Sequence, residues 1–179
     1  MITKTVATQK IIGAYRDTPA LDCPIKSGND KKWSKHMSVK QISVTLENVP
    51  GAFLNISEYL AAEGINIRAI SVADTSDITT VRFVTDDPTK TANVLKSHSY
   101  MIKLINVIAV EIPDHPGGLR AVLKPLKAAN INVLYFYPHL GRGESGQPIV
   151  ILGVDKTEEA IEVLKKNWVH TFDKEIYAL

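Results

Sequence analysis

The sequence contains one cysteine, Cys23, among 179 residues, and no apolar run long enough to cross a bilayer. A body without cysteine excludes disulfides and thiolate metal sites, and such usage is typical of proteins in a reducing cytosol. A membrane-spanning helix needs about 18 or more consecutive, mostly apolar residues. We therefore predict a cytoplasmic protein that does not associate with a membrane.

Clusters of basic residues are also missing from the body of the chain. The net charge is +2, but residues 1–36 carry seven Lys/Arg against three Asp, whereas residues 37–179 carry fourteen Lys/Arg against sixteen Asp/Glu. A mildly acidic body argues against nucleic-acid binding. The five histidines lack metal-ligand spacing, and no catalytic set can be assembled from position, so we predict no metal, no cofactor and no enzymatic activity.

The first 37 residues show little periodicity and are predicted to form a mobile extension. Met37 stands directly before the first clean strand pattern, so the extension is either a tag or an over-long start, or else an arm that docks through Ile11, Ile12 and Trp33.

One pattern occurs twice in the remaining sequence, at an offset of 66 residues. Asn48–Gly51 (Asn-Val-Pro-Gly) recurs as Asp114–Gly117 (Asp-His-Pro-Gly), each between a predicted strand and a predicted helix. A repeat at a fixed offset identifies the structural unit, here one of about 65 residues. We predict two domains, residues 38–106 and 107–179, in which the last strand of the first runs without a turn into the first strand of the second.

Hydrophobic periodicity predicts a β-α-β-β-α-β order in each copy. The first copy has strands at 39–47, 65–73, 79–85 and 101–112. Its first helix is predicted from Phe53, Ile56 and Leu60 at helical spacing and ends at Gly64, and its second runs to about Ser97 behind the cap Asp87. In strand 39–47, Ile42, Val44 and Leu46 point to one face and Gln41, Ser43, Thr45 and Glu47 to the other. The second copy has helices at 117–129, with a kink expected at Pro125, and at 155–167, with an Asp155–Glu158 capping box. Its further strands are predicted at 131–137, 147–154 and 169–177, the first of these buried on both faces.

Such units fold as ferredoxin-like sandwiches with both helices on one face of an antiparallel sheet. The repeated loop then lies at a helix N-terminus, where backbone N–H groups and the helix dipole attract carboxylates. Glycine admits a ligand close to the backbone. The same residues also form an ordinary turn and cap, and spacing leaves both interpretations open.

The two copies resemble the ACT domain, through Asn48-x-Pro50-Gly51, Phe53, Leu60 and Gly64–Ile67, and again through Asp114-x-Pro116-Gly117, Leu119, Leu126 and Asn130–Val133. Residues 38–179 together resemble the small stand-alone tandem-ACT proteins. The resemblance implies an α+β fold of two units and a regulatory module that binds free amino acids at interfaces between paired ACT domains. Carried over by position, the ligand-binding residues are Asn48, Val49, Gly51, Ala52, Phe53, Asn66, Asp114, His115, Gly117, Gly118, Leu119 and Asn132.

The two candidate sites differ, because Asn48 is replaced by a charged Asp114 and Val49 by His115. We expect a homodimer that senses an amino acid, with output to a separately encoded metabolic enzyme, because no catalytic domain is attached. An alternative is an interaction module that regulates an enzyme or regulator without binding a ligand. A small ferredoxin-like enzyme is the third hypothesis, for which the sequence offers no substrate.

Overall fold

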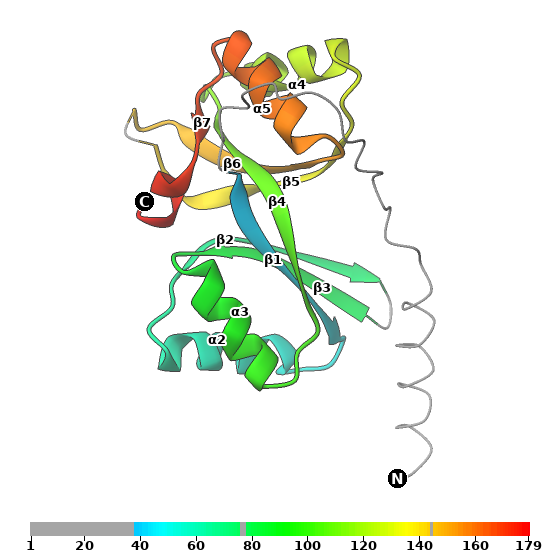
Figure 1. The fold of residues 1–179 in the computed structure, drawn as a ribbon, viewed down its shortest axis with the longest axis vertical. Helices are drawn as coiled ribbons and strands as arrows, with labels where there is room; N and C mark the ends of the chain where they lie inside the picture. The colour runs from blue at the N-terminus through cyan, green and yellow to red at the C-terminus, as the bar shows by residue number, and fades with distance from the viewer. Residues whose placement is uncertain (1–37, 76–77, 144) are drawn as a thin grey trace, which may run out of the picture. The chain divides into compact units, whose positions relative to one another are not determined.

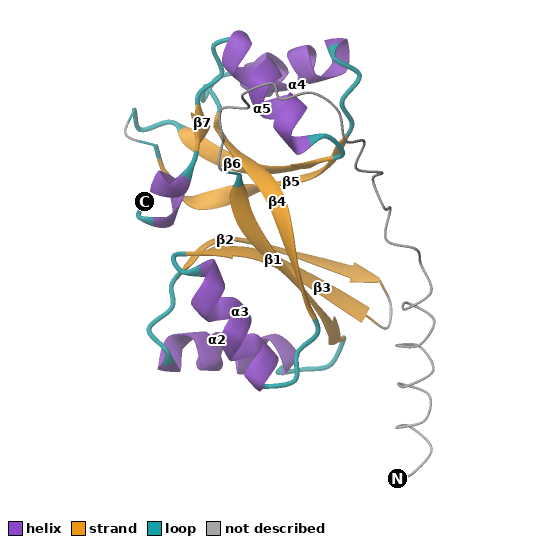
Figure 2. Ribbon diagram, viewed as in Figure 1, coloured by secondary structure: helices purple, strands orange, loops and turns teal. Residues whose placement is uncertain are grey.

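The computed structural model describes residues 38–75, 78–143 and 145–179, so the predicted extension of residues 1–37 lies outside the described part. Figures 1 and 2 show its helices and strands with the labels used here. In chain order they are β1 (Val39–Glu47), α2 (Ala52–Ala62), β2 (Ile67–Thr75), β3 (Ile78–Thr85), α3 (Pro88–Ser97), β4 (Ile102–Glu111), α4 (Gly118–Ala128), β5 (Val133–Arg142), β6 (Pro148–Val154), α5 (Thr157–Lys166), β7 (Thr171–Phe172) and the 3-10 turn η1 (Lys174–Tyr177).

The first half of the chain, β1 to the start of β4, follows the predicted pattern closely. Helix α3 begins with Pro88 behind the N-cap Asp87, whose carboxylate accepts a 2.8 Å hydrogen bond from the amide of Lys90. The carboxylate thereby satisfies an amide that the first helical turn leaves without a partner. Helix α2 is followed by Gly64, whose φ of +66° places it in the left-handed region that suits glycine after a helix.

The second half departs from the prediction at three places. The Asp155–Glu158 capping box is wrong, because the N-cap of α5 is Lys156 and Asp155 instead accepts a 3.0 Å hydrogen bond from the amide of Asn132. The last strand is only two residues long, and the chain then turns through η1. Strand β5 extends to Arg142 rather than ending at residue 137. Helix α4 does continue through Pro125, as the repeat requires.

Strand β4 belongs to both halves. Its first part pairs antiparallel with β1, from Val44–Ile102 to Val39–Val107, and its second part pairs with β6 and β7. Figure 1 shows this strand running from the first half into the second. The predicted passage from one copy to the next without a turn is therefore confirmed.

The sheet is continuous rather than divided into two separate sheets. Strand neighbours run β1-β3-β2-β5-β6-β4-β7, and the additional β1–β4 pairing closes six of these strands into a ring. Strands β2 and β5 meet at the pair Ala69–His139. The α+β class with antiparallel pairing is confirmed, and the sheets of the two copies, which were expected to have a strand in common, are joined into this closed one. Helices α2 and α3 cover the outside of the first half and α4 and α5 that of the second (Figure 2).

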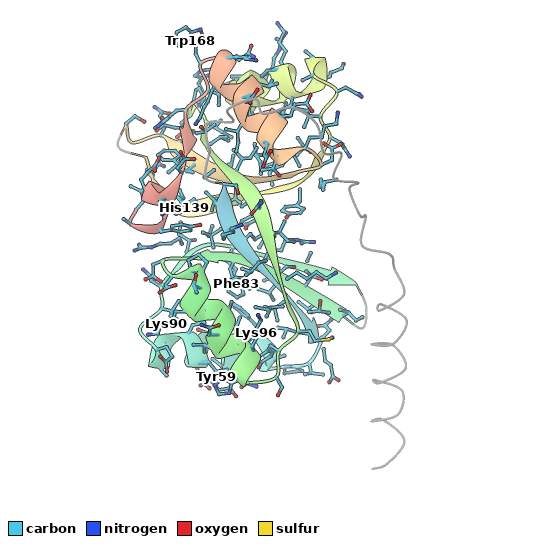
Figure 3. The ribbon with its side chains drawn as sticks, viewed as in Figure 1. Tyr59, Phe83, Lys90, Lys96, His139 and Trp168 are labelled. Atoms are coloured by element: carbon cyan, nitrogen blue, oxygen red, sulfur yellow. The ribbon has the colours of Figure 1, made fainter. Side chains whose placement is uncertain are left out.

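Three apolar clusters fill the described part. Two lie between a pair of helices and the sheet, one in each half, and include Phe83 (Figure 3) and Leu152. The third is lined by residues of both halves on the inner side of the closed sheet, among them Val39, Ala69, Tyr137, Ile151 and Ile176.

Two expectations about the burial of strand faces differ from the structure. Gln41 does lie on the face opposite Ile42, Val44 and Leu46, as predicted, but that face is covered at this position and Gln41 is fully buried. Strand β5 was predicted to be buried on both faces. Its residues alternate instead, since Tyr137 and His139 are buried whereas Leu134 and Phe136 are more than half exposed.

In the part of the chain that the structure describes, every helix is too short or too polar to traverse a bilayer.

Candidate functional site

The first of the two repeated loops connects β1 to α2. Its backbone is held by hydrogen bonds from the amide of Val49 to the carbonyl of Glu47 (2.9 Å) and from Ala52 to Val49 (3.2 Å). Gly51 is the N-cap of α2 with φ +86°, a left-handed conformation that side chains disfavour. A Cβ atom built on Gly51 would meet no atom within 4 Å, so the helix N-terminus opens onto free space. The whole loop is exposed, with Val49 at 53%.

The second loop, between β4 and α4, has the same backbone form. Gly117 is the N-cap of α4 with φ +89°, and the space beside it is again open. Its neighbour Gly118 is buried, and a Cβ there would collide with the carbonyl oxygen of Pro113. The chain at this helix start is therefore packed more closely than in the first loop, where Ala52 stands at the corresponding position.

The second loop already makes polar contacts within the protein, through one backbone amide and the side chains of Asp114 and His115. The amide of Asp114 donates a 2.8 Å hydrogen bond to Oε1 of Gln147, and its carboxylate lies 3.8 Å from the guanidinium of Arg142. Nδ1 of His115 donates to the carbonyl of Pro116 at 3.0 Å. The Asp114–Arg142 pair is well exposed on both sides, and exposed pairs of this kind contribute about 0–1 kcal/mol. A ligand could therefore displace Arg142 from Asp114 at little cost.

Asn66 and Asn132 lie away from the loops of their own halves. Helix α2 has eleven residues, about 16 Å at 1.5 Å per residue, and it separates Gly51 from Asn66. The amide of Asn66 donates to the carboxylate of Asp86 at 3.1 Å, just as the amide of Asn132 donates to Asp155. The fold therefore does not gather Asn66 with the first loop or Asn132 with the second.

Phe53 and Leu119, two further predicted contact residues, are partly buried against the helix-covered clusters of their halves. They hold the first turn of each helix on the sheet. This packing fixes the direction in which each helix N-terminus points.

Two surface grooves lie in the second half. One, of about 560 Å³, runs between the end of α4 and the start of β5 and includes Asn132, Lys127 and Asp155. The other, of about 340 Å³, is lined by Glu111, Gln147 and His170 among others. Neither groove is lined by residues 48–53 or 114–119. Within the described residues, no three His, Cys, Asp or Glu side chains gather closely enough to hold a metal ion.

A buried polar group that the sequence did not indicate joins the two halves. Nε2 of Gln41 donates to the hydroxyl of Tyr135 at 3.0 Å, and the hydroxyl of Tyr137 donates to Oε1 of Gln41 at 2.9 Å. Burial raises the pKa of the Tyr137 hydroxyl, with a smaller contribution from Tyr135 and an opposing one from Arg82. The guanidinium of Arg82 lies 4.7 Å from the centre of the Tyr135 ring.

His139 is a second buried polar residue, at the pair where β2 and β5 meet in the closed sheet (Figure 3). Its Nδ1 accepts a 2.9 Å hydrogen bond from the amide of Gly141, and its Nε2 has no partner among the described residues. Burial lowers the pKa of this imidazole. The hydrogen bond from the Gly141 amide requires an unprotonated Nδ1, so it favours the neutral imidazole as well.

The C-terminal segment crosses from the second half onto the first. The guanidinium of Arg68 on β2 donates to the carbonyls of Tyr177 (3.1 Å) and Leu179 (2.6 Å). The amide of Lys40 on β1 donates to the Tyr177 hydroxyl at 2.8 Å, and Ile176 is fully buried. The two halves are therefore joined by hydrogen bonds as well as by the shared strand.

Comparison with known proteins identifies the family. A family model described as an ACT domain pair matches residues 37–178. The structure is similar to protein BT0572 from Bacteroides thetaiotaomicron, with 30% sequence identity over 80% of this chain and 99% of that one and a TM-score of 0.74. No curated protein matches the chain.

More distant structures share the fold. The regulatory subunit of aspartate kinase from Thermus thermophilus, in a ligand-free form, is 14% identical over 74% of this chain and 94% of that one, with a TM-score of 0.53. The alpha and beta subunits of an aspartokinase are 19% identical over 72% and 91%, with a TM-score of 0.50. On the match of the family model and the similarity to BT0572, the chain belongs to the ACT-domain family and carries a pair of ACT domains.

Proposed function

We propose that this protein is a non-catalytic regulator that binds a free amino acid at its strand-to-helix loops and passes the signal to a separate protein. The observation that carries the proposal is the repeated helix N-terminus, in which Gly51 and Gly117 hold the same left-handed conformation beside open space. Regulatory subunits of aspartate kinase share the fold, which supports a regulatory role.

The proposed ligand, a free amino acid, is a zwitterion with a carboxylate and an ammonium group. The first amides of an α-helix have no acceptor within the helix, and the helix dipole adds partial positive charge there. A carboxylate is stabilised at that position, and an absent side chain at Gly51 or Gly117 lets it approach. The ammonium group of the same ligand would meet Asn48 in the first loop and Asp114 in the second.

We propose that the two loops differ in affinity. In the second loop the carboxylate of Asp114 attracts an ammonium group more strongly than the neutral Asn48, once Arg142 has been displaced. Ala52, Phe53, Gly118 and Leu119 would support the loops rather than contact the ligand. Asn66 and Asn132 would contribute only to a site that combines a loop with a strand of another half or another copy.

The two domains, residues 38–106 and 107–179, and the ferredoxin-like character of each remain proposals. They are supported by the strand neighbours, β4-β1-β3-β2 in the first half and β7-β4-β6-β5 in the second. The boundary between the domains would fall inside β4, which makes independent motion of the two units unfavourable.

A thermal-shift panel of the twenty amino acids tests the function. A ligand present at a hundred times its Kd stabilises the folded state by about 2.7 kcal/mol. For a domain of this size, about 2–4 °C accompanies each kcal/mol, so we expect a rise in Tm of about 5–10 °C with one or two amino acids. A panel without any response would refute amino-acid sensing.

A matched pair of glycine variants locates the site. Gly51→Ala places a methyl group in the loop at a positive φ, which costs about 1–2 kcal/mol of stability. Gly64→Ala carries the same backbone cost and the same open space at the other end of α2. We expect both variants to fold with a lowered Tm. Only in Gly51→Ala should the amino acid raise the Tm less than it does in the wild-type chain. Equal ligand responses in the two variants would exclude the first loop as the site, and Gly117→Ala tests the second loop in the same way.

We also propose that the chain forms a homodimer through the outer face of β5. Leu134, Phe136 and Leu140 are 51–67% exposed on this strand, and contiguous exposed apolar residues commonly mark protein interfaces. Phe136→Lys should shift a dimer toward monomer in analytical ultracentrifugation. Trp168→Lys is the control, because Trp168 is 96% exposed but lies in the turn between α5 and β7. A monomeric wild-type chain would contradict this proposal.

The second candidate function is an interaction module without a ligand, and the same exposed face favours it. In that case the amino-acid panel would give no shift, while Phe136→Lys would abolish binding to the regulated enzyme.

A further inference from the structure

On the helix-free face of the first half, the burial of the side chains changes along the strands. Residues paired across antiparallel strands point to the same face, so the register defines rows of side chains. One row contains the pairs Ala69–Val84 and Gln41–Ile105, in which three of the four residues are fully buried beneath the second half. The burial decreases along the strands from that row.

The next row contains two cations. Arg82 pairs with Ser71 on one side and with Ser43 on the other, and Ser43 pairs in turn with Lys103. Ser71, Arg82 and Ser43 are half-buried, and Lys103 is exposed. The row of Ser71, Arg82, Ser43 and Lys103, hereafter the basic row, therefore lies at the rim where the cover of the second half ends.

The side chain of Arg82 is held in place by the second half. Its guanidinium lies over the ring of Tyr135, 4.7 Å from the ring centre, and the Tyr135 hydroxyl is fixed by Gln41. The same ring packs on Gly153 so closely that a Cβ atom there would collide with it. The Arg82 side chain is thus held against Tyr135 of the second half rather than moving freely in solvent.

The basic row has no acidic partner in the described residues. Neither Arg82 nor Lys103 lies within ion-pair distance of a described carboxylate. The next row outward pairs Thr80 with Thr45 and Ala73, so the three rows contain no Asp or Glu at all. A half-buried guanidinium without a counter-charge raises the free energy of the folded protein, and a bound anion would remove that cost.

We propose that the basic row is a binding site for a doubly charged oxyanion, namely phosphate or a phosphate ester. Adjacent strands are about 4.8 Å apart, so Arg82 and Lys103 are separated by about 10 Å at the backbone, with Ser43 between them. Their long side chains can converge on one group of this size. The planar guanidinium donates two parallel hydrogen bonds to a phosphoryl group, the ammonium supplies a point charge, and the serine hydroxyls donate further bonds.

This site is separate from the strand-to-helix loops. It lies on the helix-free face, and its residues come from β1, β2, β3 and β4 and not from a loop. Because the anion would bind Arg82 where Tyr135 of the second half supports it, binding would also strengthen the contact between the two halves. Anion binding is therefore expected whether or not an amino acid binds to the loops.

Isothermal titration of the full chain with inorganic phosphate, in a phosphate-free buffer of constant ionic strength, tests the proposal. We expect saturable binding that weakens at higher sodium chloride, since salt screens exposed charges. A second titration with glycerol phosphate distinguishes a free phosphate from a phosphate ester as the preferred form, and either result supports the site. Acetate at the same ionic strength should bind at least about tenfold more weakly, because it carries one charge.

Substitutions assign the binding to the basic row. Arg82→Gln and Lys103→Gln should each weaken phosphate binding about tenfold or more, since charge-assisted hydrogen bonds are lost. Lys96→Gln is the control, because Lys96 is an exposed cation on α3 (Figure 3) and should leave the affinity unchanged. Arg82→Lys retains the charge and guards against a folding defect in Arg82→Gln. No saturable binding to the wild-type chain, or equal affinities for wild type, Arg82→Gln and Lys103→Gln, would overturn the proposal.

Discussion

The buried side chain of Gln41 offers the sharpest test of how the two halves are joined. It is fully buried, and it hydrogen-bonds the hydroxyls of Tyr135 and Tyr137 across the closed sheet. Gln41→Leu keeps the volume of the side chain approximately constant and removes both hydrogen bonds. The Tyr137 hydroxyl, itself in a side chain that is 4% exposed, then loses its acceptor.

The expected destabilisation follows from that lost acceptor. A buried polar group without a partner costs about 1–3 kcal/mol. Gln41→Leu should therefore lower the free energy of unfolding by about 1–3 kcal/mol. Gln41→Ala adds a cavity and should cost about 3–5 kcal/mol in total. Thr45→Ala is the control, because Thr45 is on the same strand and face but exposed.

A double-mutant cycle separates the hydrogen bond from general packing. Tyr137→Phe removes the hydroxyl that Gln41→Leu leaves unsatisfied, so the double variant should be more stable than the sum of the single effects by about 0.5–3 kcal/mol. Urea unfolding followed by circular dichroism gives the four free energies. Additive effects, or a Gln41→Leu variant as stable as wild type, would refute the assigned hydrogen bonds.

Three further predictions concern other contacts. Because burial lowers the pKa of His139 from about 6.5, the unfolded chain binds a proton at mildly acidic pH that the folded chain does not. Stability should thus fall as the pH drops below about 6.5, and His139→Gln should flatten this dependence in urea melts; an unchanged pH profile would contradict the burial of a neutral imidazole. Gly118→Ala should lower the free energy of unfolding in urea by about 1–3 kcal/mol, because its methyl group meets the carbonyl of Pro113; an unaltered free energy of unfolding would mean that the helix start can move. Arg68→Ala should release the C-terminal segment, seen as faster amide hydrogen exchange around Tyr177, whereas unchanged exchange would show that apolar packing alone holds it.

The secondary structure followed largely from the sequence. Strict alternation in residues 39–47 predicted β1 with its correct bounds, and the pair Asp87–Pro88 predicted the start of α3. These signals are local, since they depend on neighbours within one element. The absence of a turn between the copies also predicted the shared strand β4.

What the sequence did not reveal depends on contacts between the halves. Gln41 has the polarity of an exposed residue, and only its contact with tyrosines 94 and 96 positions away makes it a buried one. Strand β7 is short for a similar reason. After Phe172 the chain leaves the sheet, and Ile176 is buried in the inner cluster. Asp155 matched a capping pattern but bonds the amide of Asn132 instead. Local periodicity carries no information about which distant segment covers a face.

The candidate loops lie between these two cases. Their position between strand and helix could be inferred from the repeated Pro-Gly, whereas the positive φ of Gly51 and Gly117 comes from the structure. Whether Asn66 lies near the first loop could not be inferred from the motif. The motif gives the order of residues along the chain, but not the distance that helix α2 places between Gly51 and Asn66.

The most direct test of the central claim is the change in Tm of the full chain and of its Gly51→Ala, Gly117→Ala and Gly64→Ala variants across the twenty free amino acids. We predict that one or two amino acids raise the Tm of the wild-type chain by about 5–10 °C. We also predict that a loop variant loses this rise while Gly64→Ala retains it. A panel with no response, or a response that both loop variants keep, would contradict the assignment of the strand-to-helix loops as amino-acid sites.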